Sequence, residues 1–257
     1  MPLTGFVPEG APTWIDLATP DLDASVTFYT GLFGWGHTDL GPEAGHYGMF
    51  TKGGRKVAGI IEAAPGQPQI WAVYLRTDDI NTSITLAGQA GGMLLAGPHR
   101  MPGEGSLAAV ADAAGAPVFF FQPGGSNGFE VIDEAGAAVW FEQWSSDYDA
   151  SVDFYRTAAK WPVNVMDDSP DFRYCTYGAG ESARAGIFDA AEVFVHDGGQ
   201  SAWHVYFGVD DVDAALATAV ELGGTVTGDP HDSPHGRLVQ VTDPHGTTFF
   251  ITTGHQH

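Results

Sequence analysis

Apolar residues in this chain follow two patterns. Some segments have an apolar residue at every second position, as strands do, and others have the spacing of about 3.6 residues that is typical of helices. Residues 13–18 alternate as in a half-buried strand, and Asp21 then precedes apolar residues at helical spacing. The apolar residues of that helix are Leu22, Val26, Tyr29 and Phe33. Further apolar runs at residues 36–40, 47–51 and 56–62 predict three more strands. The first quarter of the chain is therefore predicted to form a strand, a helix and three strands.

This unit recurs three more times. In the second copy, the strands are expected at 71–76, 93–96, 106–111 and 117–122 and the helix at 79–90. The helices of the third and fourth copies are expected at 147–159 and 211–222. The halves also repeat residues: Trp14, Trp35 and Trp71 return as Trp140, Trp161 and Trp203, and residues 23–29 return as 149–155. The chain is thus a duplicated unit, and positions where the copies differ in chemistry become candidates for function.

The repeat predicts two domains of the α+β class. At 257 residues and 44% hydrophobic content, the chain has enough apolar material for two cores. A Gly- and Ser-rich stretch at residues 124–128 has no apolar period and predicts a linker. We therefore expect tandem domains at residues 1–125 and 130–257.

A large excess of acidic residues limits the partners of the chain. It has 10 Lys and Arg against 32 Asp and Glu, and the net charge of −22 repels nucleic acids and anionic membrane surfaces. A cationic small molecule would be attracted. The sequence has neither an apolar run of about 18 residues nor a signal-like start, so we expect a cytoplasmic protein. Cys175 is the single cysteine, which excludes an intrachain disulfide and a cysteine-based zinc site.

The repeated unit contains two motifs, an Asp-x-x-x-Ser-x-x-Phe-Tyr helix start and an Asp-x-x-Gly turn. They occur at residues 21–29, 147–155, 112–115 and 243–246. With them, the chain resembles the vicinal oxygen chelate superfamily of glyoxalases, bleomycin resistance proteins and extradiol dioxygenases. It is most similar to tandem actinobacterial members, some described as hydroxylases or accessories of antibiotic pathways. The resemblance implies that paired βαβββ units curl into half-closed β-barrel cups with helices outside and a small molecule inside.

By the superfamily pattern, metal ligands come from three strand positions in each domain. These positions hold Trp14, Ala72 and Phe119 in the first domain and Trp140, His204 and Phe250 in the second. A catalytic divalent ion needs about three nitrogen or oxygen ligands from the protein, and a single imidazole cannot hold it. We therefore expect no metal, and we predict no other cofactor.

An irregular metal site is an alternative. Glu142 lies two positions beyond Trp140 on the same strand, so both side chains are expected on the same face, together with His204. With His235 from a nearby loop, these residues would form a His/Glu site for a metal-dependent lyase or dioxygenase.

Strand alternation also gives the residues expected inside each cup. The first cup should contain Trp14, Asp16, Tyr74, Arg76, Phe119 and Phe121, and the second Trp140, Glu142, His204, Tyr206 and Phe250. Aromatic walls with a few polar groups suit a planar, mostly apolar ligand. The same aromatic residues could instead fill a closed barrel as core, and both interpretations stay open here.

The second cup is the predicted working site because His204 has only Ala72 as its counterpart in the first half. His204, oriented and made more basic by Glu142, would act as a general base, Tyr206 would donate to an oxyanion, and Trp140 would form a wall. We predict a metal-independent protein that binds an aromatic or polyketide-like metabolite, leaving open whether it transforms it by proton abstraction or hydroxylase-like chemistry. The alternative is a resistance protein that sequesters a cationic planar drug. We expect a tandem protein of this kind to be a monomer or a homodimer.

Overall fold

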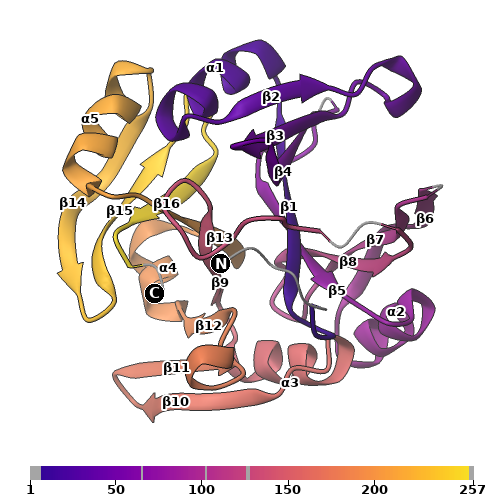
Figure 1. Ribbon diagram of the computed structural model, residues 1–257. Coiled ribbons are helices and arrows are strands. Elements are labelled where there is room, and N and C mark those ends of the chain that lie inside the picture. Colours follow the sequence, from indigo (N-terminus) through magenta and orange to yellow (C-terminus); the bar gives the residue numbers. More distant parts are fainter. Residues whose placement is uncertain (1–6, 65, 102, 126–127, 255–257) are drawn as a thin grey trace.

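The computed structural model describes residues 7–64, 66–101, 103–125 and 128–254. Ser126 and Asn127 of the predicted linker lie outside these ranges. Within them, the chain forms two eight-stranded sheets with helices packed on them, which confirms the predicted α+β architecture (Figure 1). The sheets are open and curved, as expected of half-closed cups. The exact domain limits at residues 125 and 130 stay a prediction.

The first sheet comes from the first two units of the repeat. Its elements are β1 (Pro12–Thr19), α1 (Leu22–Phe33), β2 (Gly36–Asp39), β3 (Gly48–Lys52), β4 (Arg55–Glu62), β5 (Trp71–Arg76), α2 (Ile80–Gln89), β6 (Met93–Met101), β7 (Gly105–Ala111) and β8 (Pro117–Pro123). The strand order is β2-β3-β4-β1-β5-β8-β7-β6. At the centre, β1 runs antiparallel to β5 and parallel to β4. Every element predicted in this half is present, and β6 extends further than the alternation indicated.

The second sheet repeats this topology. Its elements are β9 (Ala138–Ser145), α3 (Tyr148–Ala158), β10 (Val163–Ser169), β11 (Phe172–Tyr177), β12 (Gly186–Asp189), α4 (Ala191–Asp197), β13 (Ala202–Gly208), α5 (Val212–Glu221), β14 (Thr225–Ser233), β15 (Gly236–Thr242) and β16 (Thr248–Thr252). The order β10-β11-β12-β9-β13-β16-β15-β14 matches the first sheet strand for strand. The short helix α4, between β12 and β13, has no counterpart in the first half as far as the structure describes it, and the sequence pattern did not predict it.

Aspartates begin the main helix of each unit. Asp21, Asp79, Asp147 and Asp211 each accept a hydrogen bond from a backbone N–H in the first helical turn. The serine of the helix motif has a different partner, a hydroxyl at the end of the preceding strand. Ser151 lies 2.7 Å from Ser145, and Ser25 lies 2.6 Å from Thr19. The motif therefore fixes both the start of the helix and its position on the sheet.

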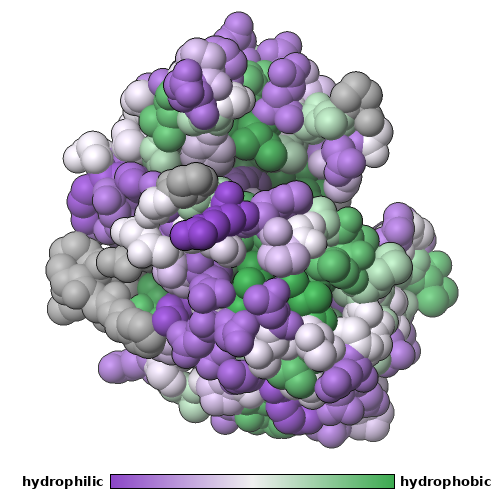
Figure 2. Space-filling view, turned by 90° about the vertical axis from the view of Figure 1, so that its right-hand side faces the viewer, coloured by the Kyte–Doolittle hydropathy of each residue, from purple (hydrophilic) through white to green (hydrophobic). Residues whose placement is uncertain are grey.

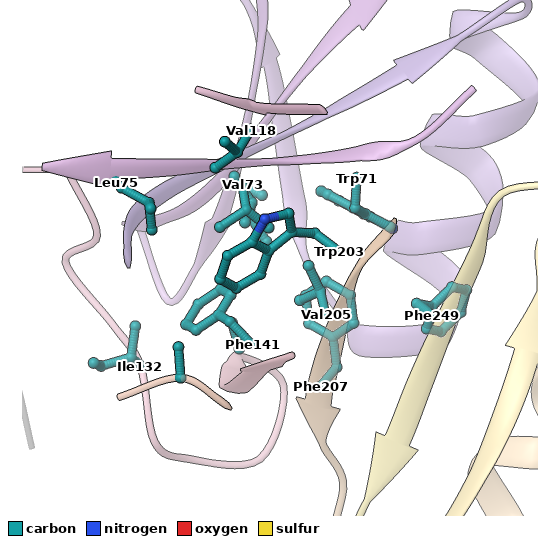
Figure 3. Close-up of a cluster of buried hydrophobic side chains, with 14 of the residues drawn as sticks. Trp71, Val73, Leu75, Val118, Ile132, Phe141, Trp203, Val205, Phe207 and Phe249 are labelled. Atoms are coloured by element: carbon teal, nitrogen blue, oxygen red, sulfur yellow. The ribbon is translucent and has the colours of Figure 1, made fainter. Parts of the chain in front are cut away.

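The two sheets pack against each other through their convex faces. β13 contacts β5 and β8, while α1 packs on α5 and α2 packs on α3 (Figure 1). Apolar side chains from the central strands β5, β9 and β13 fill the space between the sheets (Figure 3). Among them are Trp71, Val73, Leu75, Phe141, Trp203 and Val205. These helices lie on the outer face of each sheet, as predicted, but they also form part of the interface between the domains. The concave faces therefore point away from this interface.

The interface contains the same hydrogen-bonded pair twice. Tyr155 donates to Asp112 across the interface at 2.7 Å, and Tyr29 donates to Asp243 at 3.1 Å. The indole of Trp203 donates to Tyr155, and that of Trp71 donates to Tyr29. Burial raises the pKa of the Asp112 carboxyl above its usual value. Both signature motifs of the sequence thus meet at the domain interface, the tyrosine from one half and the Asp-x-x-Gly turn from the other.

Two glycine pairs, Gly91-Gly92 after α2 and Gly223-Gly224 after α5, allow the two halves to approach closely at this interface. The first glycine of each pair, Gly91 or Gly223, has a positive φ of 86° or 90° that ends the helix. The second makes room for a phenylalanine of the other half. A Cβ on Gly92 would lie 2.4 Å from the Phe154 ring, and one on Gly224 would lie 3.0 Å from the Phe28 ring.

No helix in the described part of the chain is long and apolar enough to cross a lipid bilayer.

Candidate ligand site

The concave face of the first sheet carries a buried carboxylate that accepts hydrogen bonds from two side chains. Asp16 on β1 accepts from the Tyr47 hydroxyl at 2.5 Å and from the Trp14 indole at 2.9 Å, and the Tyr74 hydroxyl on β5 lies near it. Burial raises the pKa of Asp16, although these donors oppose the shift. Gly59, opposite Asp16 on β4, leaves the space for this cluster, since a Cβ there would lie 1.8 Å from the Tyr47 hydroxyl.

The walls of the first cup form an apolar cluster separate from the main core. Its buried members are Ala72, Tyr74 and Phe121, with Trp14, Ile70, Met101, Leu107 and Phe119 packed against them. The Tyr74 and Phe119 rings lie 4.7 Å apart. Arg76, which was also expected in this cup, forms an ion pair with Asp78 at 2.6 Å. The ligand-binding role of Trp14, Asp16, Tyr74 and Phe119 stays a prediction.

The surface is hollowed near this cup. Figure 2 faces the side of the molecule that carries β6, β7 and β8, and it shows hydrophobic residues gathered beside a notch in the surface. A mostly polar hollow of about 530 Å³ lies at the β6–β7 end of the sheet. Arg100, Met101 and Gln122 line it. Met101 also belongs to the apolar cluster of the first cup, so this hollow adjoins the cup.

The second cup repeats the carboxylate cluster with glutamate in place of aspartate. Glu142 on β9 accepts hydrogen bonds from three side chains, each at 2.7 Å: Tyr174, Tyr206 and the Trp144 indole. The Trp140 indole donates to the Tyr174 hydroxyl at 3.1 Å. Burial and the nearby Glu142 raise the pKa of both tyrosines well above the usual value. Both phenols therefore keep their protons, and Tyr206 donates to Glu142 in this structure.

Aromatic rings form the walls of the second cup. Tyr206 and Phe250 stack with centroids 4.4 Å apart and an interplanar angle of 7°. The ring centroid of Trp144 lies 5.8 Å from that of Phe250 and 5.6 Å from that of Phe188. An aromatic ligand placed here would find ring faces on several sides and a polar group at the base.

His204 on β13 lies directly across the strand pair from Glu142. Its ring centroid is 4.7 Å from Trp144 and 5.7 Å from Phe250. In the described structure, its Nδ1 atom is buried without a hydrogen-bond partner, and the Glu142 carboxylate bonds to Tyr174, Tyr206 and Trp144 instead. Burial lowers the pKa of His204 to about 4. The expectation that Glu142 would orient His204 and make it more basic is therefore wrong, and the imidazole is neutral at physiological pH.

Strand register shows that the two clusters are equivalent. Asp16 pairs with Gly59 and Ala72, and Glu142 pairs with Gly186 and His204. The equivalent side chains are Trp14 and Trp140, Asp16 and Glu142, Tyr47 and Tyr174, and Tyr74 and Tyr206.

Sequence analysis missed Tyr47, Tyr174 and Trp144. Trp144 could have been found, since it follows Glu142 by two positions on the same strand. Tyr47 directly precedes β3 and Tyr174 lies within β11, two strands away from β1 and β9 in the sheet order. The one available signal was a glycine at the same position of each half, Gly59 and Gly186.

The residues at the superfamily's metal-ligand positions do not fit a divalent ion. In the first domain they are Trp14, Ala72 and Phe119, and in the second Trp140, His204 and Phe250. Among the described residues, no group of three or more His, Cys, Asp or Glu side chains lies close enough together to hold a metal. His235 is exposed in the turn between β14 and β15, so the irregular site with His204 and Glu142 does not form.

Comparison with known proteins gives consistent matches over both halves. A family model described as glyoxalase/bleomycin resistance protein/dioxygenase superfamily matches residues 12–120, and a glyoxalase-like domain model matches residues 138–252. The anthracycline biosynthesis protein DnrV of Streptomyces peucetius is 34% identical, over 97% of this chain and 94% of its own length. The glyoxylase-named CFP32 of Mycobacterium tuberculosis is 31% identical, over 98% of this chain and 97% of its own length.

Solved structures share the fold at low sequence identity. The Mn(II)-bound glyoxalase from Novosphingobium aromaticivorans superposes with a TM-score of 0.68 at 15% identity, over 96% of this chain and 83% of that one. The 2,3-dioxygenase LapB from Pseudomonas sp. KL28 gives 0.67 at 11% identity, over 98% and 95%. At these identities the likeness concerns the fold alone.

Proposed function

Because this chain belongs to the glyoxalase/bleomycin resistance/dioxygenase group, the vicinal oxygen chelate superfamily, we propose that its second cup binds a planar aromatic metabolite of the polyketide type. The stacked Tyr206–Phe250 pair carries this proposal, because it offers a flat apolar face beside the polar Glu142 cluster. A relative named for anthracycline biosynthesis supports the choice of ligand class.

The proposed function does not depend on a metal. Trp140 and Phe250 occupy two of the three expected ligand positions in the second domain, and neither side chain can coordinate an ion. Both side chains instead add aromatic surface to the cup. His204 is thereby left to interact with the organic ligand itself.

Binding fits this geometry better than base catalysis. A general base works best when the pKa of its conjugate acid lies near the operating pH, and burial holds that of His204 at about 4. Proton abstraction by His204, with Tyr206 as donor, is the second candidate. One observation favours it: the Nδ1 atom is buried and has no protein partner within the described structure.

The repeat supplies a matched pair of variants for the test. Alizarin, a dihydroxyanthraquinone, is titrated into the protein and binding is followed by quenching of tryptophan fluorescence. Phe250→Ala should weaken binding about tenfold, because it removes roughly 1.4 kcal/mol of ring contact. Phe119→Ala, the equivalent change in the first cup, should leave the affinity within about twofold.

The titration is run with a chelator present throughout and repeated without it. Equal affinity in both conditions is expected. Absence of saturable binding, a requirement for metal, or a loss of affinity confined to Phe119→Ala would contradict the proposal. Circular dichroism of both variants checks that they fold.

A further inference from the structure

His204 carries a hydrogen-bonding atom that the described protein leaves unused. Its side chain is only 8% exposed, and Nδ1 is buried without a partner. Buried polar atoms in folded proteins nearly always have a partner, and an unpaired one destabilises the fold. A nitrogen left in this condition inside a candidate ligand site points to a partner that arrives with the ligand.

Three described neighbours of His204, Trp144, Phe250 and Glu142, do not supply that partner. Trp144 and Phe250 present ring surfaces to it. Glu142, across the strand pair, is an acceptor whose oxygens already bond to Tyr174, Tyr206 and Trp144. The indole N–H of Trp144 is used in one of these bonds. Of these three neighbours, two are aromatic rings and the third is already engaged, and within the described residues Nδ1 has no hydrogen-bond partner.

The first half shows that the fold does not require this imidazole. Ala72 occupies the same register position opposite Asp16 as His204 does opposite Glu142. The carboxylate, both tyrosines and the first tryptophan are present in both cups, but the imidazole is present in one. His204 is thus a difference between two otherwise similar sites.

We propose that His204 selects ligands that place a hydroxyl group against Nδ1. This inference rests on the proposed function of the second cup. A hydroxyl both donates and accepts, so it satisfies Nδ1 in either tautomer of the neutral ring. A carboxylate is disfavoured because Glu142 lies opposite and would repel it. The ligand class is therefore an uncharged aromatic molecule with a hydroxyl group on its ring.

The selection is tested with two probes of nearly equal shape, 2-naphthol and 2-methylnaphthalene. The wild-type protein should bind 2-naphthol about tenfold more tightly, because only the hydroxyl pairs with the buried nitrogen. In His204→Ala, which copies Ala72 of the first cup, the two probes should bind equally. His235→Ala, a change at an exposed histidine, should keep the preference.

The outcomes separate this inference from the proposed function. If the wild-type protein binds both probes equally well, the hydroxyl selection is wrong and the aromatic site stands. If neither probe binds, the aromatic site itself is wrong. Nitrogen-15 NMR of histidine-labelled wild-type protein gives an independent readout, should His204→Ala fail to fold. The Nδ1 resonance of His204 should shift with 2-naphthol and stay in place with 2-methylnaphthalene, and an unchanged resonance with 2-naphthol would contradict the inference.

Discussion

At the scale of single residues, the carboxylates of the two cups make similar hydrogen bonds although one belongs to an aspartate and the other to a glutamate. Asp16 and Glu142 differ by a methylene group, yet each accepts a hydrogen bond from the equivalent tyrosine, Tyr47 or Tyr174, and from an indole. The extra length of Glu142 coincides with a change of indole donor, from Trp14 in the first cup to Trp144 in the second. The position of the indole donor thus differs between the two cups together with the length of the acidic side chain.

His204 predicts a pH dependence of stability. Its pKa is about 4 in the folded protein, against about 6.5 when unfolded, so only the unfolded chain takes up a proton between these values. Stability is fully present above pH 6.5 and falls as the pH drops toward 4, by about 3 kcal/mol. Urea unfolding at several pH values should show this loss in wild type, beyond the loss seen in His204→Ala. Parallel pH profiles of the two proteins would contradict the assignment.

At the scale of elements, helix caps and strand alternation were enough to predict the repeated units. Asp21 and Asp147 act as local signals, and the apolar period locates the helices and strands that follow. Contacts between distant segments left no such signal. The bond from Tyr155 to Asp112 joins a helix to a turn of the other domain, and Tyr174 reaches Glu142 from two strands away. The repeat in the sequence shows that these residues occur in both halves, but it does not predict which residues they contact.

The short helix α4 was missed for a different reason. It has seven residues and no buried side chain, and Val195 within it is 82% exposed. A helix without a buried apolar face produces no helical period in the sequence. The residue at its N-cap position, Ala190, has no side chain that could cap the helix, and the Ala191 N–H instead donates to Asp189, one residue further back.

The interface tyrosines allow a test of how the domains hold together. Tyr155→Phe removes the hydroxyl that bonds to the buried Asp112 carboxyl and accepts from Trp203. We expect a loss of about 1 to 3 kcal/mol in the free energy of unfolding. Tyr29→Phe should have an effect of the same sign, since it has the equivalent contacts. Urea denaturation measures both, and a double-mutant cycle with Asp112→Asn should show strong coupling for Tyr155 and none for Tyr29.

At the scale of the whole molecule, the two domains share one apolar core. Trp71 of the first sheet and Trp203 of the second are both buried in it, with Phe207 in ring contact with Trp71 across the interface. Neither sheet can separate without exposing these rings. We therefore expect a single unfolding transition in urea, with tryptophan fluorescence and far-ultraviolet circular dichroism giving the same midpoint. Two separate transitions would mean that the domains unfold independently.

The doubled tyrosine–aspartate contact has a consequence for how such a chain can diversify. Each half carries both the donor and the acceptor, so two identical single-unit chains could associate through the same pair of bonds. In such an assembly, any substitution would appear in both pockets at once. Joining the units in one polypeptide removes that restriction, and an imidazole can enter one pocket while its twin keeps a methyl group.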